Sequence, residues 1–289
     1  MTFQESLDTV LAALGRAAWA EAERGLADAE PLAGDEADRA RVALYRASIP
    51  VLRGDADPDL RLFRENIVRR HSARHVAIAG YYILIHMLNK GDLGTAERYL
   101  PPYLAAVREL GDAAHTTAAL DIEATVDSLR GRHVAAIERL RAALAELDTY
   151  DRPDALLART TANHNLAYNC LAANRFADAL PYADTGVQYA EELGRKDVLA
   201  QTLITAAFAH LCCESLDEAV RLATRAEPFA AGTRMERYAH YVLGEVARRR
   251  GNRDEAATHF RRLEELYPDI PGVAEILLSM NVAPFLLPE

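Results

Sequence analysis

Hydrophobic positions recur every three to four residues along the chain, which is the spacing of one buried face of an α-helix. Alanine and leucine fill many of these positions, while aromatic residues make up only 7% of the sequence. The longest apolar run, residues 76–85, is far shorter than the ~20 residues that a membrane-spanning helix needs. We therefore expect an all-α protein in which this run is a buried helix.

The helical segments repeat with a long period. Near the C-terminus, Gly244 and Ala256 are small, Leu243 and Phe260 are large, and Gly251 stands between the two segments. Small residues let two antiparallel helices approach closely, large ones fill the remaining gap, and glycine permits the turn. The same arrangement recurs around six upstream turn positions: Gly15, Gly54, Gly91, Gly131, Asn174 and Glu214.

This arrangement resembles the tetratricopeptide repeat in a long-period form, because the turns are about 39 residues apart instead of about 34. It is similar to the repeats of MalT-type bacterial regulators, of the peptide-sensing Rap and PlcR families and of kinesin light chains. The resemblance implies a right-handed superhelical solenoid of about seven antiparallel helix pairs. Residues 1–272 would form this solenoid, and residues 273–289 a C-terminal capping helix with an apolar tail.

Helix-start signals agree with this register. Ser215 with Glu218, and Thr233 with Glu236, have the spacing of a capping box. Asp57 followed by Pro58 suits an N-cap with proline at the first helical position. These signals predict helix starts at three of the places where the repeat requires one.

Charge and cysteine content narrow the range of partners and compartments. The chain has 43 acidic and 33 basic residues, a net charge of −10, and three cysteines. Nucleic acid is excluded as a partner on this basis, since phosphate binding needs a clustered positive surface. No membrane segment and no secretory signal are expected, and so few cysteines fit a reduced cytoplasm.

Candidate chemistry is sparse. His71 and His75 have a spacing that can hold a metal, but Arg69, Arg70 and Arg74 would repel a cation. The vicinal pair Cys212 and Cys213 has no evident base and is interpreted as structural. We therefore expect no catalytic residue, no cofactor and no metal, so that the protein is not an enzyme.

The register instead predicts which side chains of each first helix point into the concave groove of the solenoid. Aromatic faces can anchor apolar side chains, and amides can pair with a peptide backbone. Asn165 also resembles the asparagine that peptide-binding tetratricopeptides place at this point of the repeat. The predicted groove residues are Tyr81, Tyr82, Asn89, Thr125, His164, Asn165, Tyr168, Gln201, Thr205, Phe208, Tyr238, Tyr241, Glu245 and Arg249.

Three functions are compatible with these observations. The first is a non-enzymatic scaffold or adaptor that binds a protein or peptide in its concave groove. The second is a regulatory subunit that senses a ligand or signalling peptide, and the third is a hydrolase with an unrecognised site. For the apolar tail, a homodimer contact is the alternative to a cap.

Overall fold

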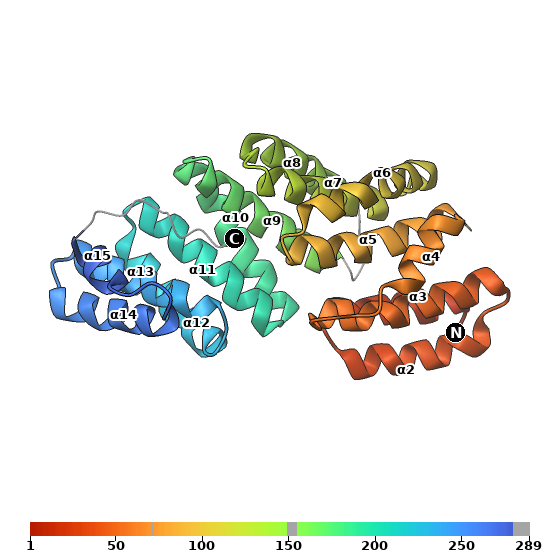
Figure 1. The fold of residues 1–289 in the computed structure, drawn as a ribbon, viewed down its shortest axis with the longest axis horizontal. Coiled ribbons are helices and arrows are strands. Elements are labelled where there is room, and N and C mark those ends of the chain that lie inside the picture. The colour runs from red at the N-terminus through yellow and green to blue at the C-terminus, as the bar shows by residue number, and fades with distance from the viewer. Residues whose placement is uncertain (71, 149–154, 280–289) are drawn as a thin grey trace. The chain divides into compact units, whose positions relative to one another are not determined.

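The structure is a computed structural model that describes residues 1–70, 72–148 and 155–279. These residues form fifteen α-helices and one short 3-10 helix, and no β-strand is present among them. Most helices pack mainly against their neighbours in the sequence, as Figure 1 shows. The all-α fold of successive helix pairs that the hydrophobic pattern predicts is confirmed.

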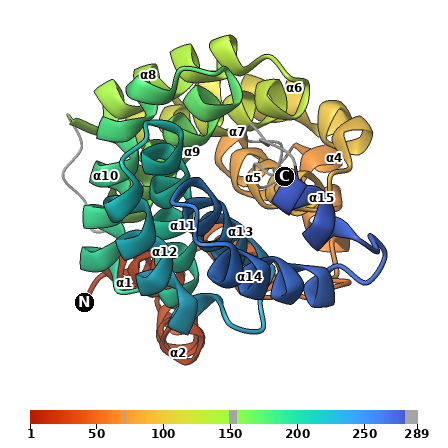
Figure 2. The same ribbon diagram turned by 90° about the vertical axis from the view of Figure 1, so that its left-hand side faces the viewer.

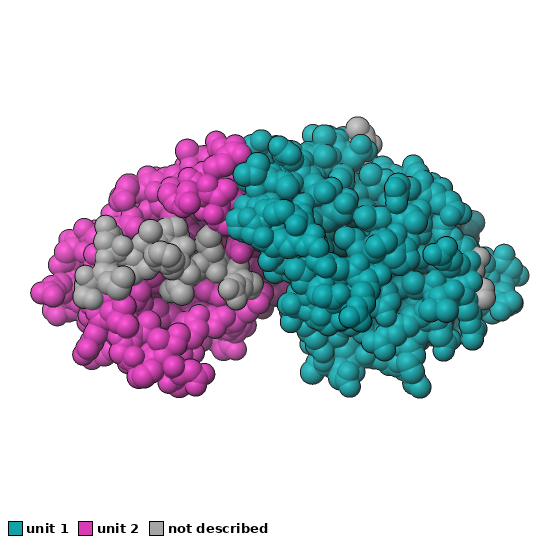
Figure 3. Space-filling model, turned by 45° about the horizontal axis from the view of Figure 1, so that its top comes forward, with its two compact units in different colours: residues 1–159 teal, residues 160–289 magenta. Residues whose placement is uncertain are grey.

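The chain divides into two compact units, residues 1–159 and 160–289, which Figure 3 colours separately and which are described one at a time below. This division falls inside the range 1–272 that the sequence assigns to a single solenoid. The helices of the first unit are α1 (Phe3–Gly15), α2 (Trp19–Ala29), η1 (Glu30–Leu32), α3 (Glu36–Arg53), α4 (Arg61–Arg69), α5 (Ala73–Asn89), α6 (Leu93–Leu110), α7 (Ala113–Leu129) and α8 (His133–Asp148).

The boundary between the units lies within α9 (Ala155–Ala172). The second unit continues with α10 (Phe176–Leu193), α11 (Lys196–Cys212), α12 (Leu216–Ala230), α13 (Met235–Arg249), α14 (Arg253–Leu266) and α15 (Val273–Ser279). Figures 1 and 2 both place α13 beside α14, and these two helices are a contacting pair. In this unit α11 also contacts α13, so the first helices of successive pairs share a face.

The turns within the helix pairs are closed by residues with a left-handed backbone. Six of the seven predicted turn positions have a positive φ: Gly54, Gly91, Gly131, Asn174, Glu214 and Gly251. The prediction at Gly15 is wrong by two residues, because Gly15 is the last residue of α1 and the positive φ (56°) belongs to Ala17. Ala17 donates its N–H to the Leu14 carbonyl, which fixes the turn at this residue.

The predicted helix starts are only partly correct. Helix α12 begins after Ser215 as expected, but the Ser215 side chain makes no capping hydrogen bond. Helix α13 begins at Met235, two residues after Thr233. Asp57 and Pro58 precede α4, which starts at Arg61, so they do not cap it.

The core of the first unit is a continuous cluster of buried aliphatic and aromatic side chains. Phe63, Ile83 and Leu84 are fully buried, and Tyr103 is 1% exposed. Trp19, the single tryptophan of the sequence, is partly buried and packs against this cluster. Apolar burial of this kind is the main stabilising contribution to a helical repeat.

Helix α15 packs on α14 and buries Ala274 and Leu277. Ile276, on the other face of this short helix, is 47% exposed. Residues 280–289, which include the predicted tail residues Val282, Phe285 and Leu286, lie outside the described residues. A cap formed by residues 273–289 therefore stays a prediction.

Candidate functional site

In the second unit the predicted groove residues lie on α9, α11 and α13, the first helices of their pairs. They differ in how far they reach solvent. The buried ones are Thr205, Phe208, Tyr238, Tyr241 and Glu245. The partly buried ones are His164, Asn165, Tyr168, Gln201 and Arg249.

An aromatic stack joins α11 to α13. The rings of Phe208 and Tyr241 are nearly parallel, with their centroids 5.4 Å apart and an angle of 14° between their planes. Both side chains are 1% exposed. Burial raises the pKa of the Tyr241 phenol well above its ordinary value, with the Glu245 carboxylate adding to the effect, so the hydroxyl stays protonated. The stack therefore forms an uncharged, rigid floor between the two helices.

One turn further along α13, a buried carboxylate is held by two arginines. Glu245 is 1% exposed and accepts hydrogen bonds from Arg248 at 2.7 Å and from Arg249 at 2.8 Å. Arg249 also donates to the Leu211 carbonyl at 3.0 Å and to the Glu214 carboxylate at 2.7 Å. The cluster ties the end of α13 to the end of α11 and leaves the Glu245 carboxylate fully paired.

Two of the predicted groove residues have a polar atom that is buried without a hydrogen-bond partner among the described residues: Nδ1 of His164 on α9 and Oγ1 of Thr205 on α11. Burial, together with the charge of Arg234, lowers the pKa of His164 to about 4, so the imidazole is neutral at neutral pH. A buried polar group without a partner costs about 1–3 kcal/mol. Such groups suit a face that acquires its partners when a ligand binds.

The predicted groove residues of the first unit lie on α5 and α7. Tyr81 is partly buried and meets buried Tyr82 edge to face, with ring centroids 5.3 Å apart. Tyr82 also packs on Phe63, so it belongs to the core. Thr125 donates its hydroxyl to the Asp121 carbonyl one turn earlier, and Asn89 is exposed at the end of α5. None of these four side chains has a buried polar atom without a hydrogen-bond partner among the described residues.

A cavity of about 500 Å³ lies elsewhere in the first unit, between α4, α5 and the segment before α4. Its charged groups are largely engaged with each other or with the backbone. Arg61 pairs with Asp59 at 2.7 Å, and Lys90 donates to the Ala56 carbonyl at 2.8 Å. The lining mixes both signs of charge and does not select a ligand.

The surroundings of His75 and Cys212, which were also considered as reactive residues, indicate structural roles. His75 is buried, with its Nε2 3.0 Å from the Ala37 carbonyl, while His71 lies outside the described residues. Burial raises the pKa of Cys212 to about 11, which keeps it a thiol.

Within residues 1–70, 72–148 and 155–279, no group of three or more His, Cys, Asp or Glu side chains is arranged to hold a metal. No helix of the described chain is long and apolar enough to cross a bilayer.

The register missed Arg234 and Arg248. Arg248 pairs with Glu245, and the charge of Arg234, which directly precedes α13, helps to lower the pKa of His164. A helical register gives the direction of the Cα–Cβ bond and says little about where a flexible guanidinium ends. The run of three arginines at residues 248–250 was the sequence signal that could have identified Arg248.

Residues 237–270, which span α13 and α14, match the family model of the tetratricopeptide repeat. The α13–α14 pair is therefore a tetratricopeptide-type repeat. No curated protein sequence matches the chain significantly.

Solved structures extend the likeness of this repeat protein over most of its length. A Rap protein complexed with Competence and Sporulation Factor has a TM-score of 0.66 at 14% identity, covering 92% of this chain and 75% of that one. The apo form of RapI has a TM-score of 0.64 at 10% identity, covering 95% and 79%. BtubC from P. vanneervenii has a TM-score of 0.58 at 18% identity, covering 80% and 93%. At these identities the likeness shows a shared fold.

Proposed function

We propose that this repeat protein is a non-enzymatic scaffold or adaptor that binds an extended segment of a protein or peptide. The binding face is formed by α9, α11 and α13 of the second unit. The partly buried amides of Asn165 and Gln201 supply both donors and acceptors for a peptide backbone. The buried Phe208–Tyr241 stack holds α11 against α13 and so keeps this face rigid.

The observation that carries the proposal is the pair of unpartnered polar atoms, His164 Nδ1 and Thr205 Oγ1. Most buried polar groups in native proteins are hydrogen-bonded, so two such atoms among the predicted groove residues need a reason. A bound peptide would satisfy both atoms. In this proposal the desolvation cost in the free protein is offset by the hydrogen bonds of the complex.

A regulatory subunit that senses a ligand or signalling peptide is the second candidate. Its support is the likeness to two Rap structures, one of them complexed with Competence and Sporulation Factor. Both candidates use the same face. The three cysteines are free thiols in the structure, which suits a reducing compartment such as the cytoplasm.

The test uses random peptides displayed on phage and selected on the full chain. The enriched peptide is synthesised with a fluorescent label and titrated with protein variants by anisotropy. Thr205→Val removes the orphaned hydroxyl with little change in volume, and Asn165→Ala removes an amide. Each should weaken binding by roughly 1–2 kcal/mol, close to tenfold, because one ligand hydrogen bond is lost.

Thr202→Val is the matched control. Thr202 is buried on the same helix, but its hydroxyl already donates to the Val198 carbonyl at 3.0 Å. This variant should bind the peptide like the wild type. In the absence of peptide, Thr205→Val should raise the free energy of unfolding, whereas Thr202→Val should lower it. If no peptide is enriched, or if both test variants keep full affinity, the peptide-binding site does not lie on this face.

A further inference from the structure

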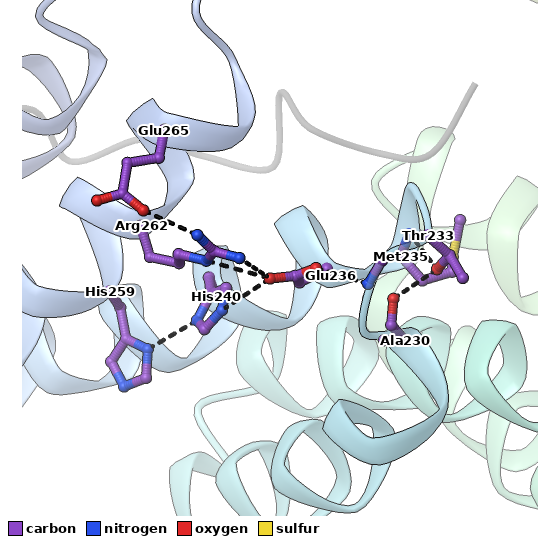
Figure 4. A network of polar contacts seen from close by, with 9 residues as sticks. Ala230, Thr233, Met235, Glu236, His240, His259, Arg262 and Glu265 are labelled. Carbon is purple, nitrogen blue, oxygen red and sulfur yellow. Dashed lines mark hydrogen bonds and ion pairs between the residues drawn. The ribbon is translucent and has the colours of Figure 1, made fainter.

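Two histidines face each other across the last complete helix pair. Nδ1 of His240 on α13 lies 3.1 Å from Nδ1 of His259 on α14, with ring centroids 5.4 Å apart. Figure 4 shows the two rings pointing toward one another. Both side chains are partly buried, so solvent still reaches the pair.

At neutral pH both imidazoles are uncharged. Burial lowers the pKa of each histidine, and for His240 the charge of His259 and that of Arg262 act in the same direction. A hydrogen bond between two Nδ1 atoms uses one proton and one lone pair. Transfer of that proton to Nε2 of the same ring, a change of tautomer, would leave one lone pair on each Nδ1 atom for a shared ion.

The separation of the nitrogens fits a shared metal ion. Zinc binds imidazole nitrogen at about 2.0–2.1 Å in tetrahedral geometry, so two such bonds place their nitrogens about 3.3–3.4 Å apart. The observed separation of 3.1 Å is close to this value, and binding requires the two nitrogens to move slightly apart. Neutral imidazole suits zinc, copper and nickel, and it does not suit calcium or magnesium.

The surrounding charge favours a cation. Glu227 on α12 acts electrostatically on both histidines, Glu236 on His240, and Glu255 on His259, against Arg262 as the one basic group. The Glu227 carboxylate makes no ion pair or hydrogen bond within the described chain. The Glu236 carboxylate, in contrast, pairs with Arg262 at 2.7 Å. A carboxylate beside the outer nitrogen of a ligating histidine orients its ring, and Glu236 lies 3.9 Å from Nε2 of His240.

We propose that His240 and His259 form a binding site for a divalent transition-metal ion, zinc in the first instance, which links α13 to α14. The ion binds the two Nδ1 atoms, and water completes its coordination, while the Glu227 carboxylate contributes only its negative charge. The proton between the two rings moves to Nε2 of its own ring, and binding weakens as the pH falls because protonated imidazole cannot bind a metal ion. With two histidines as fixed ligands, the site is open and its affinity is modest compared with a closed structural zinc site.

The experiment titrates zinc chloride into the full chain at neutral pH, followed by calorimetry. One ion per chain should bind, and the melting temperature should rise with zinc concentration, since a ligand that binds only the folded state stabilises it. His240→Gln and His259→Gln should each weaken binding by more than about tenfold. Glu227→Gln should weaken it less, because it removes charge without removing a histidine.

His210→Gln is the matched control. His210 is also partly buried and also lies near a carboxylate, with Nε2 3.0 Å from Asp184, but no second histidine faces it. Zinc affinity should be unchanged in this variant. Circular dichroism of each variant without metal checks that the fold is retained.

Cobalt(II) absorption separates histidine from cysteine ligation, because thiolate ligands give intense near-ultraviolet bands and imidazole does not. Weak visible bands that vanish in His259→Gln support the site. The inference is overturned by thiolate bands, by the absence of saturable zinc binding, or by equal zinc affinity in wild type and both histidine variants. The histidine contact would then be a hydrogen bond only.

Discussion

The ring of Phe260 lies directly against the backbone of Gly244. A Cβ atom added at position 244 would come within 2.5 Å of the Phe260 Cε1 atom, a distance that packed carbon atoms do not adopt. Gly244→Ala should therefore destabilise the second unit by roughly 1–3 kcal/mol, as overpacking of a core does. Urea unfolding followed by circular dichroism measures the change.

Gly15→Ala is the control for that substitution. Gly15 ends α1, and its added Cβ would meet only the Leu157 side chain at 3.9 Å, an ordinary contact. Alanine is favoured over glycine in helices by up to about 1 kcal/mol, so this variant should be as stable as the wild type or more so. If Gly244→Ala proved as stable as Gly15→Ala, the close approach at Gly244 would be relieved by a small shift of α14.

The turn at Ala17 offers a stabilising substitution. Ala17 has a φ of 56°, a region that costs a non-glycine residue about 1–2 kcal/mol. Ala17→Gly should therefore raise the free energy of unfolding by about 1 kcal/mol after the entropic cost of glycine is included. Chemical unfolding measures this change. Ala18, the next residue, has a φ of −84°, so Ala18→Gly should give no gain.

The carboxylate of Glu245 is expected to be a strong contributor to stability. Its removal in Glu245→Ala would leave Arg248 and Arg249 without their shared partner. We expect a loss of about 2–3 kcal/mol, less than for a fully buried pair because both guanidiniums are about 20% exposed. Glu218→Ala, which breaks an exposed pair with Arg221, should cost less than about 1 kcal/mol.

Stability should fall in mild acid. The pKa of His164 is lowered to about 4, below its value of about 6.5 in the unfolded chain. The folded state then binds fewer protons than the unfolded state, so the free energy of unfolding decreases as the pH drops from about 6.5 toward about 4. His240 and His259, whose pKa values are also lowered, act in the same direction.

Urea unfolding at about pH 7 and about pH 5 tests this, since most carboxylates remain ionised at both values. His164→Gln should lose less stability over this interval than the wild type. An identical loss in the two proteins would assign the pH dependence to other groups.

The sequence predicts the turns well because each requires a particular backbone conformation. Gly54, Gly91, Gly131 and Gly251 were identified by residue type, and Asn174 and Glu214 by the repeat alone. Ala17 was missed because nothing in an alanine side chain indicates a positive φ. The contact of Phe260 with Gly244 was also predictable, since a small and a large residue alternate in the repeat.

The candidate site was less predictable. The register gives the face on which Tyr241 and Glu245 lie, yet both are 1% exposed. Their burial depends on contacts made by other side chains, namely the ring of Phe208 and the guanidiniums of Arg248 and Arg249. The missing partners of His164 and Thr205 likewise depend on the positions of three helices at once, which a single sequence does not contain.

The position of the single tryptophan has a practical consequence. Trp19 packs against the core of the first unit, so its fluorescence reports the unfolding of that unit. Far-ultraviolet circular dichroism reports all helices together. Coincident transitions from the two signals would mean that both units unfold cooperatively, while separate transitions would give each unit its own folding equilibrium.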